Sequence, residues 1–327
     1  MKLFVYAFRE SDEREIFDEL AAKYGFTYGT CAAYPSVENA HLAQGYDAIT
    51  FTPCTFAKEQ IDAFHAVGVR YIAARSIGFN HIDIPYAHAR GMGVSHVDYP
   101  PDTVADYTVM LMLMGCRKAA YILERARLQD YSLAGKLGCD IGDLTVGIIG
   151  AGRIGKSVLR DLSGFGCRLC YCNRSPSVEA DRYAERVDLD ELLARSDFVS
   201  LHLELNADTK HIIGDDAFSK MKKGTILVNT ARGPLVDTAA LIRALDSGRI
   251  GYAVLDVFED EFGLCYNDCK NMDLEKRWFG ILKKRPDVLL THHMAFYYTN
   301  AVRDMVYNCL YGMKMFGEGK EVPLRLA

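Results

Sequence analysis

The feature that most constrains the fold is a glycine-rich turn that directly follows an apolar segment. The segment Thr145–Ile149 is typical of a buried β-strand, and the turn Gly150-Ala151-Gly152-Arg153-Ile154-Gly155 after it opens a helical pattern. In such a turn Gly150 permits the tight bend, Gly152 lets a ligand approach the backbone, and Gly155 lets helix and strand pack closely. Because a helix N-terminus presents free N–H groups and a positive dipole end, the pattern predicts a site for the pyrophosphate of a dinucleotide. The alternative is a purely structural glycine turn.

The residues after the next strand bear on which dinucleotide is bound. That strand is predicted over Arg168–Cys172, and Asn173, Arg174 and Ser175 follow it. Where NAD binds through such a turn, an acidic side chain at this place holds the ribose hydroxyls, and none is present here. Arg174 can pair with a 2′-phosphate and Ser175 can donate to it. We therefore predict that NADP(H) is preferred, or accepted alongside NAD(H); an Arg174 that points into solvent or stacks on adenine gives dual specificity instead.

Strand-like segments alternate with helical patterns along the chain, which predicts an α/β fold with parallel sheets. The length of 327 residues favours two domains. Strands are predicted over Leu3–Phe8, Asp47–Thr52, Arg70–Ala73, Gly93–Val97, Thr145–Ile149, Arg168–Cys172, Phe198–His202, Thr225–Asn229, Ala253–Val257 and Val288–Thr291, and helices over Asp12–Lys23, Ala57–Ala66 and Asn300–Phe316. The last helix has no strand of its own to cover, so we expect the chain to cross back there and complete its first domain.

A break in this alternation separates the two series of strands. Two successive prolines, Pro100 and Pro101, follow Tyr99 and impose extended backbone. The segment Thr103–Asp106 then fits a capping box that opens a long helix. This helix is apolar nearly all round, so we expect it to be buried on several sides, at a domain or subunit interface.

Three chemically capable side chains follow predicted strands. Arg232 follows the strand that ends at Asn229, Glu261 follows the segment Ala253–Val257, and His293 follows Val288–Thr291. Because ligands of open α/β sheets bind beyond the carboxyl ends of the strands, we expect the three to converge on one site. An arginine fork binds a carboxylate and polarises a carbonyl, a histidine delivers a proton near neutral pH, and a carboxylate fixes the histidine tautomer. With hydride from a nicotinamide, this set suffices to reduce a ketone.

Each of these residues has a structural alternative. Arg232 is also suited to cap a helix or to pair with a surface acid, and Glu261 lies in an acidic run that suits a solvated loop. His292 is adjacent to His293, and His202 also ends a strand. Position alone does not decide between the three histidines.

Composition excludes several classes of protein. The net charge of −5 provides no basic surface for nucleic acid or a membrane. The apolar run Leu3–Phe8 is too short for a signal peptide, and no segment is long enough to span a bilayer, so we expect a cytoplasmic protein. Among ten cysteines, the clusters Cys167, Cys170, Cys172 and Cys265, Cys269 lack zinc-site spacing. We predict reduced structural thiols and no metal.

At these residues the sequence resembles the D-isomer-specific 2-hydroxyacid dehydrogenases. The resemblance covers nearly the whole chain from about Tyr46 and is strongest to the D-lactate dehydrogenase branch, including the vancomycin-resistance type. The segments that carry it are RSIGFNHID, DTVADYTVMLMLM, LTVGIIGAGRIGKSV, LSGFGC, NTARGPLVD, LDVFEDE and HMAFYYTNAVRDMV.

The resemblance implies a role for each matching residue. It implies that Arg232 binds the substrate carboxylate and carbonyl, that His293 is the acid/base, and that Glu261 orients His293. Further substrate contacts are implied for the backbone or side chains of Phe51, Ile77, Gly78, Tyr99 and Phe296. Further cofactor contacts are implied for Val104, Gly150, Gly152, Arg153, Ile154, Gly155, Asn173, Arg174, Ser175, His202, Leu203, Thr230, Ala231 and Asp256.

The family architecture implies two doubly wound parallel-sheet domains with the active site in the cleft between them. A flavodoxin-like catalytic domain would comprise residues 1–100 and 298–327, and a Rossmann-type cofactor domain, residues 101–297, would be inserted into it. Homodimers are usual in the family, and the apolar helix after Asp102 is a suitable interface. The bulky side chains among the implied substrate residues favour pyruvate or a similarly small keto acid.

Some features depart from the family pattern and leave alternatives. His292 replaces the usual proline before the catalytic histidine, Pro100 replaces a serine, and the proline expected after His202 is absent. Larger branched or aromatic 2-keto acids, phosphoglycerate and formate are alternative substrates. A dinucleotide-sensing co-repressor is the alternative from another class, but the long Ser/Pro-rich extensions that would support it are absent from this sequence.

Overall fold

The computed structural model describes residues 1–274 and 277–326. They form two compact units: a terminal unit, Met1–Pro100 with residues 297–326, and a central unit that begins at Pro101 and ends at Phe296. The sequence predicts boundaries after residues 100 and 297, and the second observed boundary lies after residue 296. Ala327, which the prediction includes in the first domain, lies outside the described residues.

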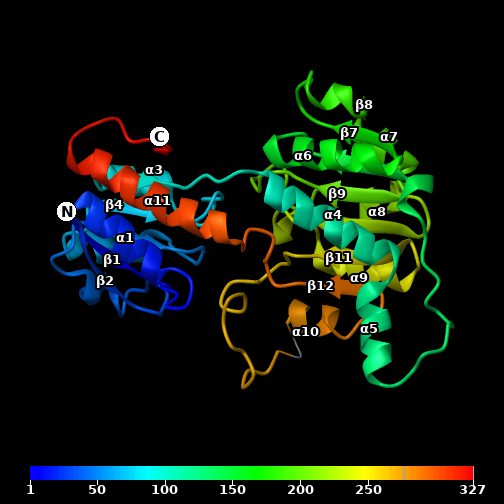
Figure 1. The fold of residues 1–327 in the computed structure, drawn as a ribbon, viewed down its shortest axis with the longest axis horizontal. Helices are drawn as coiled ribbons and strands as arrows, with labels where there is room; N and C mark the ends of the chain where they lie inside the picture. The colour runs from blue at the N-terminus through cyan, green and yellow to red at the C-terminus, as the bar shows by residue number, and fades with distance from the viewer. Residues whose placement is uncertain (275–276, 327) are drawn as a thin grey trace. The chain divides into compact units, whose positions relative to one another are not determined.

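The terminal unit contains a five-stranded parallel sheet in the order β2-β1-β3-β4-β5. Its strands are β1 (Lys2–Val5), β2 (Thr27–Thr30), β3 (Ala48–Phe51), β4 (Tyr71–Ala74) and β5 (Gly93–Ser95), and its helices are α1 (Arg14–Tyr24), α2 (Lys58–Ala66), α3 (Ile84–Ala89) and α11 (Thr299–Gly317). Helix α11, from the C-terminal segment, packs against α1 and beside β4 (Figure 1). This strand order is that of a flavodoxin-like doubly wound sheet, as predicted.

The first strand is shorter than the predicted segment Leu3–Phe8 because the backbone after β1 turns. Ala7 has a left-handed φ of 47°. The fully buried Arg75 guanidinium donates to the carbonyl oxygens of Tyr6 and Ala7 at 3.0 and 2.9 Å. These two carbonyl oxygens therefore accept hydrogen bonds from the buried Arg75 and do not continue the strand pairing of β1.

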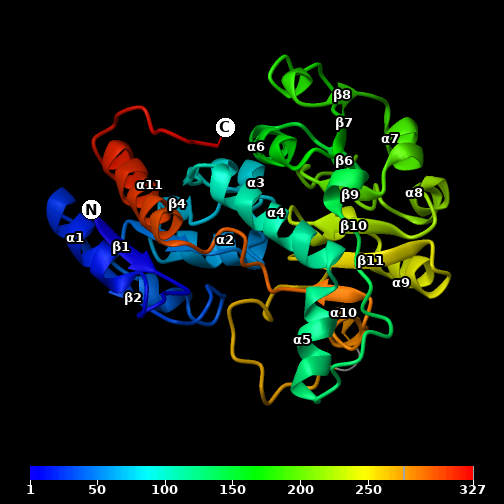
Figure 2. The same ribbon diagram turned by 45° about the vertical axis from the view of Figure 1, so that its right-hand side comes forward.

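The central unit contains a seven-stranded parallel sheet in the order β12-β11-β10-β9-β6-β7-β8. Its strands are β6 (Thr145–Ile149), β7 (Arg168–Cys172), β8 (Glu185–Arg186), β9 (Phe198–Leu201), β10 (Thr225–Asn229), β11 (Ile250–Leu255) and β12 (Val288–Leu290). Its helices are α4 (Asp102–Cys116), α5 (Ala119–Arg127), α6 (Arg153–Leu162), α7 (Leu189–Arg195), α8 (Asp215–Lys220), α9 (Thr238–Asp246) and α10 (Trp278–Leu282). The winding direction reverses between β6 and β9, which is the Rossmann arrangement (Figure 2).

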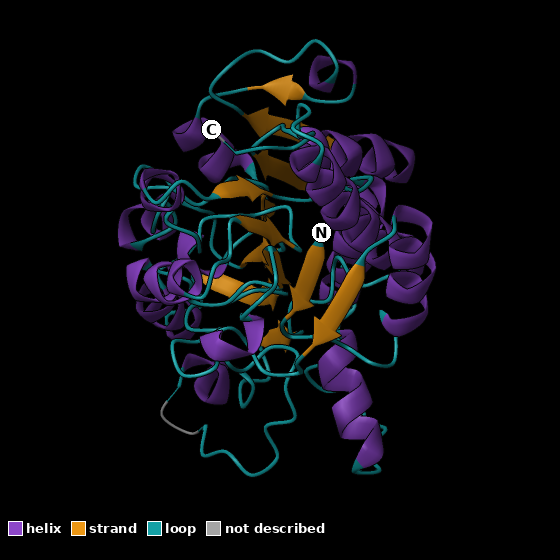
Figure 3. Ribbon diagram, turned by 90° about the vertical axis from the view of Figure 1, so that its left-hand side faces the viewer, coloured by secondary structure: helices purple, strands orange, loops and turns teal. Residues whose placement is uncertain are grey.

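Side-chain alternation along the strands gives the central unit a core on each face of its sheet. On β7, Cys170 and Cys172 belong to one hydrophobic cluster while Tyr171 belongs to the other. Helices therefore cover both faces, and strands (orange) lie between helices (purple) in Figure 3. Burial on both faces explains why these strands are continuous apolar runs in the sequence.

The predicted capping box at Thr103–Asp106 is wrong. Helix α4 already begins at Asp102, with Pro101 before it, so Thr103 lies within the first turn and does not cap it. The Asp102 carboxylate instead accepts hydrogen bonds from Ser157 Oγ at 2.9 Å and from the Arg160 guanidinium at 3.1 Å. Asp102 thus joins α4 to α6.

Helix α4 is largely buried within its own unit, although its Met110 is 42% exposed, whereas no residue of α5 is buried. Gly115 lets α4 approach β11, since a Cβ there would lie 2.9 Å from Val254 Cγ2. In contrast, α5 has no buried residue and extends from the central unit (Figures 1 and 2). Large apolar side chains on α5 and the segment after it are exposed: Leu123, Leu128, Tyr131, Leu133 and Leu137.

Two short strands are absent from the sequence prediction. Strand β2 contains Gly29, where a Cβ would lie 2.5 Å from the Tyr46 hydroxyl, so close packing displaces the usual strand residues there. Strand β8 has only two residues, both exposed, and carries no periodic signal.

All ten cysteines are free thiols. Burial raises the pKa of the Cys54 and Cys309 thiols to about 12. Over the described ranges, no three His, Cys, Asp or Glu side chains converge as metal ligands. No helix in the same ranges combines the length and apolarity needed to cross a membrane.

Candidate active site

The glycine turn joins β6 to α6 at the carboxyl end of the strand. Gly150 has a left-handed φ of 96°, and a Cβ there would lie 2.5 Å from the carbonyl oxygen of His202. A Cβ at Gly155 would lie 2.0 Å from the Gly150 carbonyl oxygen. At Gly152 a Cβ would meet no protein atom within 4 Å. Gly152 therefore leaves open space at the N-terminus of α6 that the protein does not fill, which fits the close approach of a pyrophosphate.

The end of β7 presents polar groups next to this turn. Asn173 Oδ1 accepts from the Ala151 N–H at 3.2 Å, and Asn173 Nδ2 donates to the Ser175 carbonyl at 2.9 Å. Arg174 and Ser175 are exposed. The guanidinium of Arg186, from β8, donates to the carbonyls of Asn173 and Arg174 at 3.2 and 3.4 Å. Sequence reasoning missed Arg186 because nothing in the pattern predicts β8.

The other predicted cofactor residues surround the same strand ends. Leu203 follows β9, and its Cδ2 lies 2.9 Å from the position of a Cβ at Gly150. Thr230 follows β10, and its hydroxyl pairs with that of Thr108 on α4 at 2.9 Å. Val104 is buried on the same helix. Arg153 and Ile154 form the first turn of α6, Arg153 being exposed, and Ala231 follows Thr230.

Arg232 is held at the end of β10 by its backbone. Asn229 Nδ2 donates to the Arg232 carbonyl at 2.9 Å, and Arg232 Nη1 donates to the Ala231 carbonyl at 2.6 Å. The next residue must be glycine, because a Cβ at Gly233 would lie 2.1 Å from the Phe258 carbonyl oxygen. The guanidinium is partly exposed and therefore retains donors for a ligand.

Glu261 and His293, which are far apart in the sequence, form a direct pair. His293 Nδ1 lies 2.9 Å from Glu261 Oε1, and the side chains are 17% and 12% exposed respectively. Because an ionised carboxylate only accepts hydrogen bonds, it fixes the proton on Nδ1 and directs Nε2 away from itself. The pair can therefore hold an imidazole in one tautomer and deliver a proton from the free side of the ring.

The acidic run that contains Glu261 does not form a uniformly solvated loop. Glu259 accepts from the Thr238 N–H at 2.9 Å and pairs with His211 Nε2 at 2.7 Å. Asp260 has a left-handed φ of 60° and is exposed, which turns the chain so that Glu261 points inward. Neighbouring carboxylates in the sequence thus serve different partners.

Asp256 shapes the turn that carries His293. The Asp256 side chain has no exposed surface and accepts from Thr291 Oγ1 at 2.5 Å and from the N–H groups of Met294 and Ala295 at 2.8 and 3.0 Å. The His293 N–H donates to the Asp256 carbonyl at 2.7 Å. His293 itself has a left-handed φ of 63°, which is unusual for a histidine and requires such bracing.

Two aromatic rings flank His293, one of which sequence reasoning missed. The Phe296 ring lies 6.1 Å from the imidazole, edge to face, as a wall beside it. Tyr266 contacts both rings, with centroids 5.9 Å from His293 and 5.7 Å from Phe296, and its hydroxyl donates to the His293 carbonyl at 3.3 Å. Tyr266 lies in an irregular segment after β11, so no spacing pattern identifies it.

The competing histidines have different surroundings. His292 is exposed. His202 Nε2 lies 2.9 Å from Ser200 Oγ, and enclosure by the protein lowers the pKa of its imidazole to about 4. A histidine with such a low pKa is neutral at pH 7 and a poor proton donor. Geometry therefore favours His293 as the acid.

The predicted substrate residues of the terminal unit lie near the ends of β3, β4 and β5. Ile77 and Gly78 are partly exposed in the loop after β4, and Tyr99 lies after β5, where Asn308 Nδ2 donates to the carbonyl of the preceding Asp98 at 2.8 Å. Phe51 differs, since it has no exposed surface and stacks on Phe56 with centroids 4.5 Å apart. This packing assigns Phe51 to the core and argues against a pocket wall there.

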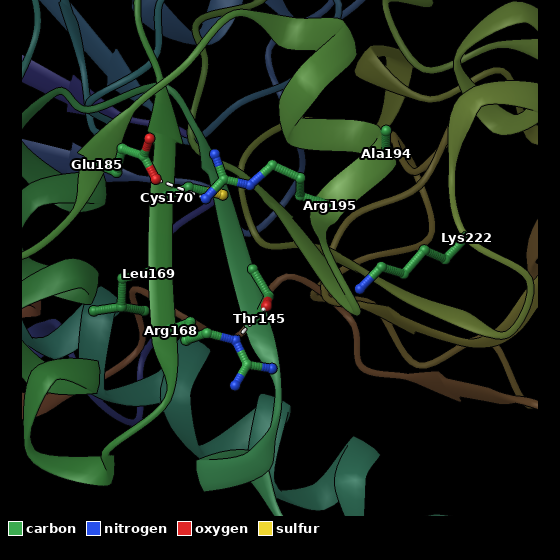
Figure 4. Close-up of a pocket in the computed structure, with 8 residues that line it drawn as sticks. All are labelled: Thr145, Arg168, Leu169, Cys170, Glu185, Ala194, Arg195 and Lys222. Carbon is green, nitrogen blue, oxygen red and sulfur yellow. Dashed lines mark hydrogen bonds and ion pairs between the residues drawn. The ribbon is translucent and has the colours of Figure 1, made fainter.

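A separate cavity of about 670 Å³ lies at the opposite, amino-terminal edge of the central sheet (Figure 4). Three cationic side chains line it, and all are paired. Arg195 pairs with Glu185 at 2.6 Å, Lys222 with Asp197 at 2.8 Å, and Arg168 donates to Thr145 Oγ1 at 3.0 Å. The cavity contains none of the predicted site residues.

The central sheet, with its glycine turn at the strand-order reversal, has the doubly wound α/β arrangement of dinucleotide-binding domains. The family model described as "D-isomer specific 2-hydroxyacid dehydrogenase, NAD binding domain" matches residues 109–295. The chain belongs to the D-isomer-specific 2-hydroxyacid dehydrogenase family, as the sequence motifs predict.

Known proteins similar to the chain include two enzymes and one solved structure. A D-specific alpha-keto acid dehydrogenase of Enterococcus faecalis is 42% identical over 306 residues, which are 92% of this chain and 94% of that protein. An aromatic 2-oxoacid reductase of Clostridium sporogenes is 36% identical over 319 residues, covering 97% and 96%. The apo structure of D-lactate dehydrogenase from Escherichia coli superposes with a TM-score of 0.87 at 31% identity and covers both chains fully.

Proposed function

We propose that this protein reduces a small 2-keto acid such as pyruvate to the D-2-hydroxy acid with a reduced nicotinamide dinucleotide. The observation that carries the proposal is the Glu261–His293 pair, 2.9 Å apart, on the same sheet as the glycine turn. Family membership supports the reaction class. The preference for a small keto acid is inferred from the bulky Phe296 ring, whose centroid lies 6.1 Å from that of the His293 imidazole.

In this proposal each side chain has one task. The bound dinucleotide supplies the hydride. Arg232 binds the substrate carboxylate and polarises the adjacent carbonyl oxygen, because its planar fork matches two oxygen acceptors. His293 donates the Nε2 proton to the oxygen that becomes the hydroxyl, and Glu261 holds the ring and stabilises its charged form. Asp256 maintains the backbone turn rather than touching the substrate.

A panel of keto acids tests the proposal. Initial rates are measured for pyruvate, 2-ketobutyrate, 2-ketoisocaproate, phenylpyruvate and 4-hydroxyphenylpyruvate, each with NADH and with NADPH. We expect the highest kcat/KM for pyruvate or 2-ketobutyrate. A much higher kcat/KM for phenylpyruvate would show that aromatic keto acids are the preferred substrates. The similarity to an aromatic 2-oxoacid reductase and the Tyr266–Phe296 ring pair would support that result. An absence of turnover with every keto acid would contradict the reaction itself and leave a dinucleotide-sensing role.

We further propose that NADPH is preferred or fully accepted. Asn173 is neutral, Arg174 is exposed beside it, and Arg186 adds a second guanidinium at the same strand end. A 2′-phosphate bound by Arg174 would therefore meet positive charge, and the neutral Asn173 would not repel it. Charge-assisted hydrogen bonds contribute about 1.5–3 kcal/mol each, and about 1.4 kcal/mol is tenfold in affinity, so one such bond favours NADPH by roughly 10- to 100-fold.

Variants at this strand end separate the contributions. Arg174→Ala is expected to lower kcat/KM for NADPH by about tenfold or more while NADH changes little. Asn173→Asp introduces a repelling charge and has the same direction of effect. Arg182→Ala, which removes an exposed arginine elsewhere in the segment after β7, serves as the matched control. A strong preference of the unmodified enzyme for NADH would show that this loop does not contact the ribose as proposed.

We propose a homodimer whose interface includes α5 and the segment after it, besides the apolar helix α4 that the sequence predicts. The exposed apolar side chains on and after α5 form the argument, since Leu133 and Leu137 are 88% and 86% exposed. Exposed apolar groups of this kind mark interaction surfaces. Leu133→Glu combined with Leu137→Glu should shift sedimentation to the mass of one chain. A single-chain mass for the unmodified protein would contradict the proposal.

The two units of the chain have different proposed roles. We propose that the central unit binds the dinucleotide and supplies Arg232, Glu261 and His293. The terminal unit contributes further contacts to the keto acid through the backbone of Ile77 and Gly78. We also propose that the enzyme acts in the cytoplasm, where thiols such as its ten cysteines stay reduced.

A further inference from the structure

The loop after β4 contains a short backbone segment that is fixed on both sides of one glycine. The Ser76 hydroxyl donates to the Gly78 carbonyl oxygen at 2.7 Å. The His96 imidazole, which follows β5, lies with Nδ1 3.0 Å from the Ile77 carbonyl oxygen. Each of the two peptide units that flank Gly78 is therefore held by one side chain.

The tautomer of His96 follows from its partner. A carbonyl oxygen only accepts hydrogen bonds, so Nδ1 of His96 must carry the proton and donate it. The Phe79 ring packs against the imidazole, with centroids 5.3 Å apart and planes at 66°. The backbone of His96 is anchored as well, because its N–H donates to the Leu324 carbonyl at 3.2 Å. The donor is thus fixed in position.

Fixing the Ile77 carbonyl also fixes the direction of the Gly78 N–H. Both belong to the same planar trans peptide unit, in which C=O and N–H point in opposite directions. His96 on one side of this unit therefore turns the Gly78 N–H to the other side. Within the described part of the chain, this N–H donates to no backbone carbonyl, and Gly78 is partly exposed.

We propose that His96, together with Ser76, is a positioning residue that aims the Gly78 N–H at the carboxylate of the substrate. The inference rests on the proposed function and on the substrate contact that the family resemblance implies for the backbone of Ile77 and Gly78. His96 touches neither substrate nor cofactor and acts only through the peptide unit. Without the His96 hydrogen bond the peptide unit can rotate, and the Gly78 N–H is no longer held in one orientation.

Steady-state kinetics with the best keto acid of the panel test this role. His96→Leu removes the donor at similar volume, and we expect KM for the keto acid to rise by about ten- to a hundred-fold, the effect of one hydrogen bond to a charged group. KM for the dinucleotide should not change, and kcat should fall less than KM rises. In His96→Asn the side-chain amide can place a donor near the Nδ1 position, so this variant should recover most of the loss. His65→Leu, at an exposed histidine on α2, is the matched control.

The outcomes distinguish the inference from the function on which it rests. An active unmodified enzyme with an unchanged keto-acid KM in His96→Leu overturns the positioning role alone. Equal losses in His96→Leu and His96→Asn, with a lowered Tm and a raised dinucleotide KM, also overturn it, because they indicate a general structural role. If His96→Leu does not fold, Ser76→Ala carries the test, with an expected rise in keto-acid KM and an unchanged value as the contradicting result. No turnover in the unmodified enzyme contradicts the proposed function itself.

Discussion

Replacing His293 by alanine is expected to lower kcat by about 10²–10⁴-fold, the usual loss when a positioned acid is removed. The reason is geometric. Glu261 holds Nδ1 at 2.9 Å, so Nε2 is the group left to donate a proton, and enclosure lowers the pKa of the rival His202 to about 4. Single-turnover and steady-state rates at saturating substrate measure the loss.

The backbone at His293 requires a second variant. Its φ of 63° is strained for alanine as well as for histidine. Asparagine tolerates this conformation better but supplies no acid, so His293→Asn should lose as much activity as His293→Ala while keeping more of the Tm. His292→Ala, at the exposed neighbour, should remain active. An inactive His292→Ala beside an active His293→Ala would contradict the assignment of the acid.

The second large effect is expected at Arg232. Arg232→Met removes both arms of the fork, and two charge-assisted bonds at roughly 1.5–3 kcal/mol each correspond to a loss of about 10²–10⁴-fold in kcat/KM. Arg232→Lys keeps the charge but not the paired geometry, so an intermediate loss is expected. Binding of the dinucleotide, followed by fluorescence, should not change in either variant.

A matched surface arginine is the control for Arg232. Arg243 lies on the exposed side of α9 and pairs with Asp215 at 2.6 Å. Arg243→Met should leave kcat/KM unchanged, since a surface ion pair contributes little. If Arg232→Met retains the kcat/KM of the unmodified enzyme, the guanidinium does not bind the substrate carboxylate.

Much of the fold could be predicted because parallel strands buried on both faces give continuous apolar runs. Strands β6, β7 and β10 have the predicted bounds, and α11 spans Thr299–Gly317 where Asn300–Phe316 is predicted. The glycine turn was also predictable from the sequence. A Cβ at Gly150 or Gly155 would lie too close to a backbone carbonyl oxygen, so both positions require glycine.

The remaining features depend on tertiary contacts that no local pattern contains. Strand β8 has two exposed residues, so Arg186 had no predicted element to place it. Tyr266 and His96 reach their partners from irregular segments. The capping box failed because α4 begins one residue earlier than predicted, at Asp102, with Pro101 before it. Phe51 was assigned to a pocket although stacking on Phe56 places it in the core.

The stereochemistry of the product decides whether the enzyme is a D-specific reductase. The unmodified enzyme is incubated with pyruvate, or with the best keto acid of the panel, and with the reduced dinucleotide that it accepts. The 2-hydroxy acid is then resolved by chiral chromatography. Formation of the R (D) enantiomer is the predicted result, and formation of the S enantiomer would contradict the proposed D-specific reduction.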